Sequence, residues 1–76
     1  MKLGETGATL LASWRWARLR TLFLEQAQLG DAGVAALARG AWPALLLLSL
    51  EDNGLTAPPT LEDARRWAPA LVELRL

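Results

Sequence analysis

Two glutamates, Glu25 and Glu51, have a type and spacing that could support catalysis. Each directly follows a Leu-x-Leu segment, so the two hold equivalent positions in the sequence. Paired carboxylates supply the acid and the base of glycoside hydrolysis when an enclosed site keeps one of them protonated. No aromatic sugar platform or third polar group accompanies this pair. We therefore expect the two carboxylates to lie close together on a hydrated surface, where they repel each other or attract a cationic side chain.

Other catalytic chemistry is excluded by the residues that the chain lacks. The sequence has no histidine and no cysteine, and its only serines are Ser13 and Ser49. Nucleophilic triads, thiol chemistry and the usual zinc sites therefore lack their residues. The segment Gly4-Glu-Thr-Gly7 superficially resembles a phosphate-binding loop, but its glycines align with Gly30 and Gly33, which begin a predicted helix. We expect a non-enzymatic protein with no catalytic residue, metal ion or cofactor.

The composition indicates one small folded unit. The chain has 76 residues, is 53% hydrophobic and has a formal net charge of zero. A unit of this length buries roughly 60% of its unfolded surface. Its balanced charge favours neither nucleic acid nor an anionic membrane, so neither is expected as a partner. The longest apolar run, residues 41–50, has about half of the roughly 20 residues that span a bilayer. Because no secretory signal is recognised either, a cytoplasmic location is expected.

A 26-residue period of leucines predicts the architecture. Three Leu-x-x-Leu-x-Leu segments occupy residues 19–24, 45–50 and 71–76. A period of this length is typical of a stacked solenoid, in which each repeat buries its apolar face against its neighbours. We expect a single unit, residues 1–76, with a partial repeat at 1–18, repeats at 19–44 and 45–70, and a terminal strand at 71–76.

Within each repeat, the apolar spacing changes from that of a strand to that of a helix. The first two helices are expected at about residues 6–16 and 32–39, with Asp31 as the N-cap of the second. The third is expected to start near Pro59 or Thr60, with Asp63 in a capping arrangement. The order predicted is therefore helix, strand, helix, strand, helix, strand.

The segment Leu45-x-x-Leu48-x-Leu50-x-x-Asn53-x-Leu55 resembles the leucine-rich repeat signature. The helical half, residues 29–38, resembles the ribonuclease-inhibitor-like and cysteine-containing-like subfamilies. The resemblance covers nearly every residue from 3 to 76. It implies an α/β solenoid of type (αβ)3, with a parallel three-stranded sheet on the concave face and helices on the convex face. It also implies that Asn53 satisfies backbone groups of the turn after the strand, a role that Ala27 leaves to neighbouring backbone or water.

The resemblance further implies a protein–protein interaction module that binds an unidentified protein partner through the concave face. Outward-pointing residues of neighbouring strands should lie about 4.8 Å apart there. Phe23 and Leu47 place apolar side chains on an otherwise polar surface and are the candidate anchors. The candidate partner-binding residues are Thr21, Phe23, Glu25, Leu47, Ser49, Glu51, Glu73 and Arg75.

Residues 13–20 combine three arginines with Trp14 and Trp16 and contain no acidic residue. Such mixing also occurs at membrane interfaces and in proteins that bind single-stranded nucleic acid. Trp16 shares its repeat position with Trp42, which indicates packing over the corner between helix and strand. Trp14 has no such counterpart, and the sequence assigns it no role.

The predicted strand Leu71–Leu76 has no helix after it in this sequence. Its outer edge should present unpaired backbone groups, and its three leucines should be only partly covered. An alternative function follows from this expectation. The chain could be a structural segment or truncated fragment of a larger leucine-rich repeat solenoid that self-associates through the edge of this strand.

Overall fold

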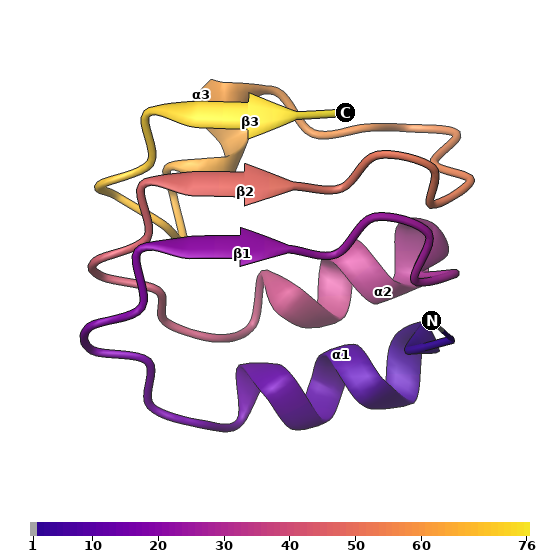
Figure 1. The fold of residues 1–76 in the computed structure, drawn as a ribbon, viewed down its shortest axis with the longest axis horizontal. Helices are drawn as coiled ribbons and strands as arrows, with labels where there is room; N and C mark the ends of the chain where they lie inside the picture. Colours follow the sequence, from indigo (N-terminus) through magenta and orange to yellow (C-terminus); the bar gives the residue numbers. More distant parts are fainter. Residues whose placement is uncertain (1) are drawn as a thin grey trace.

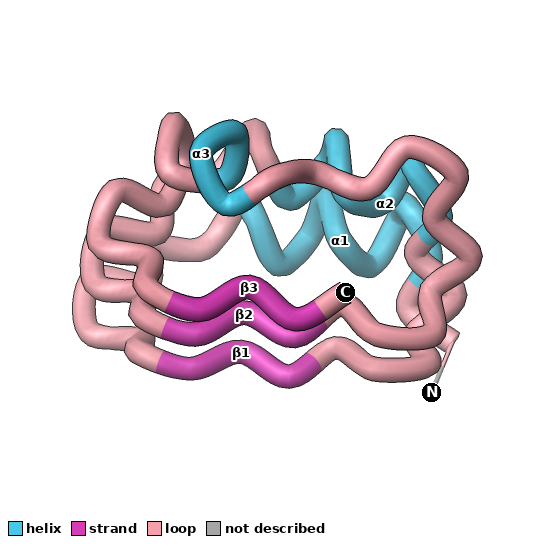
Figure 2. Tube along the Cα trace, turned by 90° about the horizontal axis from the view of Figure 1, so that it is seen from above, coloured by secondary structure: helices cyan, strands magenta, loops and turns pink. Residues whose placement is uncertain are grey.

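The computed structural model describes residues 2–76, in which three helices alternate with the strands of one parallel sheet (Figure 1). The elements in chain order are α1 (Gly4–Ala12), β1 (Thr21–Phe23), α2 (Gly30–Leu37), β2 (Leu47–Ser49), α3 (Leu61–Ala64) and β3 (Glu73–Arg75). The strands form one layer and the helices a second layer facing it (Figure 2). This confirms the predicted mixed α/β class and the three-stranded parallel sheet. None of the helices within residues 2–76 has the length and apolar character needed to cross a bilayer.

The strands pair in the order β1-β2-β3, and the register is the same in both pairs. One column across the sheet is Thr21, Leu47 and Glu73, and the next on the same face is Phe23, Ser49 and Arg75. Between them lie Leu22, Leu48 and Leu74. Because side chains alternate along a strand, these leucines point to the opposite face, where the helices lie. The predicted columns are therefore confirmed.

The core consists of leucines from each repeat segment together with small residues of the helices. Leu45, Leu48 and Leu50 around β2 are at most 1% exposed. Leu71 was expected to be only partly covered, but it is also buried. The backbone before β3 folds back at this point, and the Leu71 N–H donates to the Ala68 carbonyl at 3.0 Å. Leu71 therefore belongs to the core cluster.

Both long helices begin earlier than predicted, at Gly4 and Gly30. These glycines both have a φ of 64°, a left-handed conformation that turns the chain into the helix and that favours glycine. Helix α1 also ends early, at Ala12. The indole N–H of Trp16 donates to the carbonyl of Leu11 at 2.7 Å, which requires the chain to leave the helix and fold back.

The prediction that Asp31 is the N-cap of α2 is wrong. The N-cap position is Leu29, and Asp31 lies in the first turn of the helix. Its carboxylate instead accepts hydrogen bonds from the Thr56 hydroxyl and from the backbone N–H groups of Thr56 (3.1 Å) and Ala57 (3.2 Å). Asp31 thus ties the loop after β2 to the start of α2.

The hydrogen bond from the Thr56 hydroxyl, and those from the backbone of Ala57 and Thr56, lower the pKa of Asp31 below its ordinary value of 3.8. A lowered folded-state pKa means that ionised Asp31 stabilises the fold above about pH 4, and that this contribution is lost as the pH falls through the folded-state pKa. We expect the urea midpoint of the wild type to fall more steeply than that of Asp31→Asn between about pH 5 and pH 2. Parallel urea midpoints for the two proteins across this range would contradict the assignment.

Helix α3 begins as predicted, with Thr60 as its N-cap. The Thr60 hydroxyl accepts from the Asp63 N–H at 3.1 Å, and the Asp63 carboxylate accepts from the Thr60 N–H at 3.4 Å. This reciprocal capping box satisfies two backbone donors that the helix itself leaves free. It holds a short helix after the Pro58-Pro59 pair.

The Asn53 side chain joins the turns that follow β1 and β2. Its Oδ1 accepts from the backbone N–H groups of Ala27 (2.9 Å) and Leu29 (3.2 Å). Its Nδ2 donates to the carbonyl oxygens of Leu24 (2.8 Å) and Leu50 (2.9 Å). The predicted structural role of Asn53 is therefore confirmed. In the turn containing Ala27, neighbouring backbone bonds part of the turn as predicted, because the Ala27 carbonyl accepts from the N–H groups of Leu3 and Gly4. The N–H groups of Ala27 and Leu29 instead donate to the Asn53 side chain of the next repeat, which was not predicted.

Candidate functional site

The strand pairings align six of the candidate residues, Thr21, Phe23, Leu47, Ser49, Glu73 and Arg75, at positions that alternate with the core leucines. The helices lie on the side of the sheet to which those leucines point (Figure 2). We call the opposite surface the open face; it comprises Thr21, Phe23, Glu25, Leu47, Ser49, Glu51, Glu73 and Arg75. The register of the strands extends beyond their ends, because the Gln26 N–H donates to the Glu51 carbonyl at 3.1 Å. Glu25 and Glu51 are therefore neighbours across β1 and β2, as predicted.

Ser49 was expected to be accessible on the open face, but it is fully buried. It lies in the middle strand between Phe23 and Arg75, whose longer side chains flank it. Its hydroxyl donates to the carboxylate of Glu51 at 3.4 Å. Ser49 therefore lies between Phe23 and Arg75 and exposes no surface that a partner could contact.

The apolar part of the open face is larger than the sequence indicated. Phe23 is 50% exposed and lies diagonally across from the half-buried Leu47. Two further apolar residues are exposed at matching positions directly before β2 and β3, Leu46 (41% exposed) and Val72 (66% exposed), and the Val72 N–H donates to the Leu46 carbonyl. These four residues, Phe23, Leu46, Leu47 and Val72, are called the apolar patch below.

Leu46 and Val72 escaped prediction because the backbone does not alternate where the chain enters the strands. The carbonyl of Arg20 accepts from both Leu46 N–H (2.7 Å) and Leu47 N–H (3.1 Å). The carbonyl of Leu46 likewise accepts from both Val72 N–H (2.8 Å) and Glu73 N–H (3.0 Å). As in a β-bulge, two successive residues face one partner, so both can leave the core. In the sequence, two successive residues stand between the first and second leucines of each segment, and strict alternation would bury one of them. This pair of positions was the signal that both residues could be exposed.

Charges on the open face are unevenly paired. Arg75 Nε donates to Glu73 Oε2 at 2.6 Å, and this is the one ion pair among residues 2–76. The hydrogen bond from Arg75 to Glu73 and the charge of Glu73 raise the pKa of Arg75, with smaller contributions from Glu51 and Glu25. Glu25 and Glu51 thus interact with the charge of Arg75 at longer range. Neither of them has an ion-pair partner in the described part of the chain. The apolar patch is therefore bordered by two carboxylates that remain free to meet a cation.

The tryptophans lie at the corner between helices and strands. The rings of Trp16 and Trp42 stack at 6.2 Å with an interplanar angle of 5°. The indole N–H of Trp42 donates to the Leu37 carbonyl at 2.9 Å, as that of Trp16 does to Leu11 one repeat earlier. The predicted corner packing is therefore confirmed. Trp14 leans against Trp16 at 6.4 Å, yet is 67% exposed.

No model of a known protein family, no curated protein sequence and no solved structure matches the chain.

Proposed function

We propose that the chain is a leucine-rich repeat stack that acts as a non-catalytic module and binds another protein through the open face. The observation that carries the proposal is the apolar patch bordered by Glu25 and Glu51. Aromatic and aliphatic side chains exposed beside polar neighbours are the usual centres of protein interfaces. The constant register of the strands and the hydrogen bonds of Asn53 support the repeat assignment.

The patch favours a partner surface that combines an apolar side chain with nearby lysine or arginine. The apolar group would cover Phe23 and Leu47, and the cation would lie near Glu25 and Glu51. Unlike charges at the rim of an interface guide encounter and orientation, and their effect weakens with salt. We therefore expect binding through this face to weaken as ionic strength rises.

Selection of peptides from a displayed random library on the immobilised chain tests this proposal. We expect enrichment of peptides in which an aromatic or aliphatic residue is flanked by lysine or arginine. Phe23→Ser should weaken the binding of these peptides at least roughly tenfold, because central aromatic residues dominate interface energies. Affinities measured by fluorescence anisotropy would check the change.

The matched control is Leu10→Ser, which also removes an exposed apolar side chain, since Leu10 is 68% exposed on α1. Both variants should retain the circular dichroism spectrum of the wild type, and Leu10→Ser should retain its peptide affinity. The proposal fails if Phe23→Ser binds the selected peptides as tightly as the wild type does.

A further inference from the structure

The charges of the chain divide between two edges of the stack. Each helix is followed by a connection to the next strand, and the equivalent residues of the three connections are 13–20, 39–46 and 65–72. Together they carry six arginines and no acidic residue, whereas the rest of the chain carries Lys2, Arg75 and all eight acidic residues. The net charge of zero, on which the expectation of no membrane partner rested, therefore averages a basic part and an acidic part.

The three connections lie side by side along one edge of the structure (Figure 1). The Arg20 carbonyl accepts from the Leu46 N–H at 2.7 Å, and the Leu46 carbonyl accepts from the Val72 N–H at 2.8 Å. The Trp42 N–H also donates to the Trp67 carbonyl at 3.2 Å. Arginines of three repeats are therefore brought together. We call the three connections the basic edge; its arginines are Arg15, Arg18, Arg20, Arg39, Arg65 and Arg66.

The guanidinium groups of the basic edge are largely free. All six arginines are exposed. Among residues 2–76, only Arg65 of the six uses its side chain in a hydrogen bond, to the Leu71 carbonyl at 2.8 Å, and none of them forms an ion pair. Like charges gathered without counter-charges repel each other, and an anionic partner relieves that repulsion. The basic edge is therefore a surface that favours anions.

The basic edge is open along the stack and not only at its ends. The middle connection has a neighbouring connection on either side, yet Arg39, Ala41 and Pro43 are exposed. The exposure of this edge is therefore a property of the stack itself.

Two hollows lie between neighbouring connections. The first, of about 400 Å³, is lined by Trp14 and Pro43 together with Arg39. The second, of about 370 Å³, is lined by Pro43 and Pro69 together with Arg66. Apolar side chains therefore lie directly beside guanidinium groups on this edge.

The side chains between the arginines favour a lipid surface over a nucleic acid or a peptide. Bases of a single strand stack on free aromatic faces, but Trp16 and Trp42 stack on each other at 6.2 Å and Trp42 is buried. Pro43 and Pro69 have no N–H that could bond to a base, a sugar or a peptide carbonyl. A membrane interface requires neither feature, because it binds basic residues at its headgroups and apolar side chains beneath them.

We propose that the basic edge binds the surface of a membrane that contains anionic phospholipid. The guanidinium groups contact the headgroup phosphates, which a planar guanidinium can bind through two parallel hydrogen bonds. Trp14 and the two prolines lie at the boundary between headgroups and acyl chains, where an amphipathic ring is stable. The contact is peripheral, and each part of it uses side chains that are already exposed.

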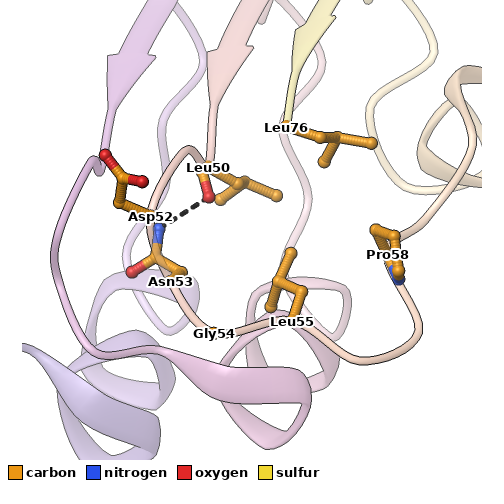
Figure 3. A pocket seen from close by; sticks show the side chains of 7 residues that line it. All are labelled: Leu50, Asp52, Asn53, Gly54, Leu55, Pro58 and Leu76. Carbon is orange, nitrogen blue, oxygen red and sulfur yellow. Dashed lines mark hydrogen bonds between the residues drawn. The ribbon is translucent and has the colours of Figure 1, made fainter.

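The acidic residues orient the chain on such a surface. The turns that follow β1 and β2, residues 24–31 and 50–57, lie at the edge opposite to the basic edge (Figure 1). They carry four carboxylates and no basic residue, and Figure 3 shows one of these carboxylates, Asp52, in the second turn. Anionic headgroups repel carboxylates as they attract arginines. The chain therefore meets the membrane with the basic edge.

Sedimentation of the chain with lipid vesicles tests this inference. Vesicles of phosphatidylcholine and phosphatidylglycerol at about two to one should bind the chain at low salt, and pure phosphatidylcholine vesicles should not. Binding should be lost as sodium chloride approaches about 0.5 M, because salt screens exposed charges. The tryptophan emission should shift to shorter wavelength on binding, and Trp14→Ala should remove most of this shift.

Substitutions of exposed arginines provide the decisive comparison. Arg15→Gln, Arg18→Gln and Arg39→Gln together should weaken binding to the anionic vesicles roughly a hundredfold, because each basic residue near an anionic surface contributes about a fivefold factor. Arg39→Gln alone should weaken it about fivefold. Lys2→Gln is its matched control, since it removes an exposed positive charge outside the basic edge and should change the affinity less than about twofold. All these variants should retain the circular dichroism spectrum of the wild type.

Equal binding of the triple variant and the wild type to the anionic vesicles would overturn the inference. Tighter binding of a single-stranded oligonucleotide or of polyglutamate than of these vesicles would also overturn it, by identifying a different polyanion as the partner. A dimer at low salt that the triple variant converts to a monomer would do so by identifying a second copy. Phe23→Ser should leave vesicle binding unchanged, so the outcome is independent of the function proposed for the open face.

Discussion

Replacing Asn53 with alanine should lower the free energy of unfolding by roughly 3–5 kcal/mol, because each buried polar group left without a partner costs about 1–3 kcal/mol. The substitution removes the hydrogen bonds to Ala27, Leu29, Leu24 and Leu50 at once. A chain of this size has a total stability of about 4–11 kcal/mol at the usual 0.05–0.15 kcal/mol for each residue. The expected loss is therefore a large share of the total stability, and urea denaturation followed by circular dichroism would measure it.

Two further variants separate the contributions to this effect. Asn53→Asp keeps the oxygens that accept from Ala27 and Leu29 but loses the donor to Leu24 and Leu50. It should also be strongly destabilised, because a carboxyl group would be buried against two carbonyl oxygens. Asp52→Asn is the control, since this exposed neighbour has a φ of 59° that asparagine tolerates. A change at Asn53 no larger than the change at Asp52 would show that water replaces the amide in the turns.

Replacing Trp42 with alanine should cost a similar amount, roughly 3–5 kcal/mol, as is usual for a buried tryptophan. Trp42 is 1% exposed, stacks on Trp16 and donates its indole N–H to Leu37. Its removal therefore opens a cavity and leaves the Leu37 carbonyl without this donor at the end of α2. The melting temperature should fall by about 4–8 °C for each kcal/mol in a domain of this size.

Two further variants test the loss of stability expected for Trp42→Ala. Trp42→Phe separates the ring stacking from the indole hydrogen bond, and Trp14→Ala is an exposed control. The phenylalanine keeps an aromatic ring against Trp16 but has no N–H, so its cost should lie between those of the wild type and Trp42→Ala. Trp14 is largely exposed, and its removal should change the free energy of unfolding by less than about 1 kcal/mol. Similar losses for Trp14→Ala and Trp42→Ala would contradict the assignment of Trp42 to the core.

The strands and the columns of the open face could be predicted from the period of leucines. Alternate leucines can be buried together only when the strands align without a shift, because a slip of one residue would turn every leucine to the other face. Thr21 therefore had to lie beside Leu47, and Leu47 beside Glu73. The role of Asn53 was also predictable, since its side chain combines a donor and an acceptor at a position where the backbone turns.

The helix boundaries and the accessibility of individual side chains could not be predicted in this way. Asp31 has the residue type of an N-cap, but the backbone of Thr56 and Ala57 lies within its reach and competes for its carboxylate. Ser49 has an outward position, but it is fully buried between Phe23 and Arg75 of the neighbouring strands. In both cases the deciding neighbour belongs to an adjacent repeat and is distant in the sequence.

By itself, the sequence determined which residues alternate into a common core, where three strands lie and that Asn53 satisfies backbone groups of a turn. These features follow from residue type and local spacing. Only the tertiary structure decided that Leu46 and Val72 are exposed like Phe23, and that the Asn53 side chain also bonds the turn of the preceding repeat. Exposure and hydrogen-bond satisfaction depend on which groups of other segments come within a few ångströms, and periodicity alone does not contain those distances.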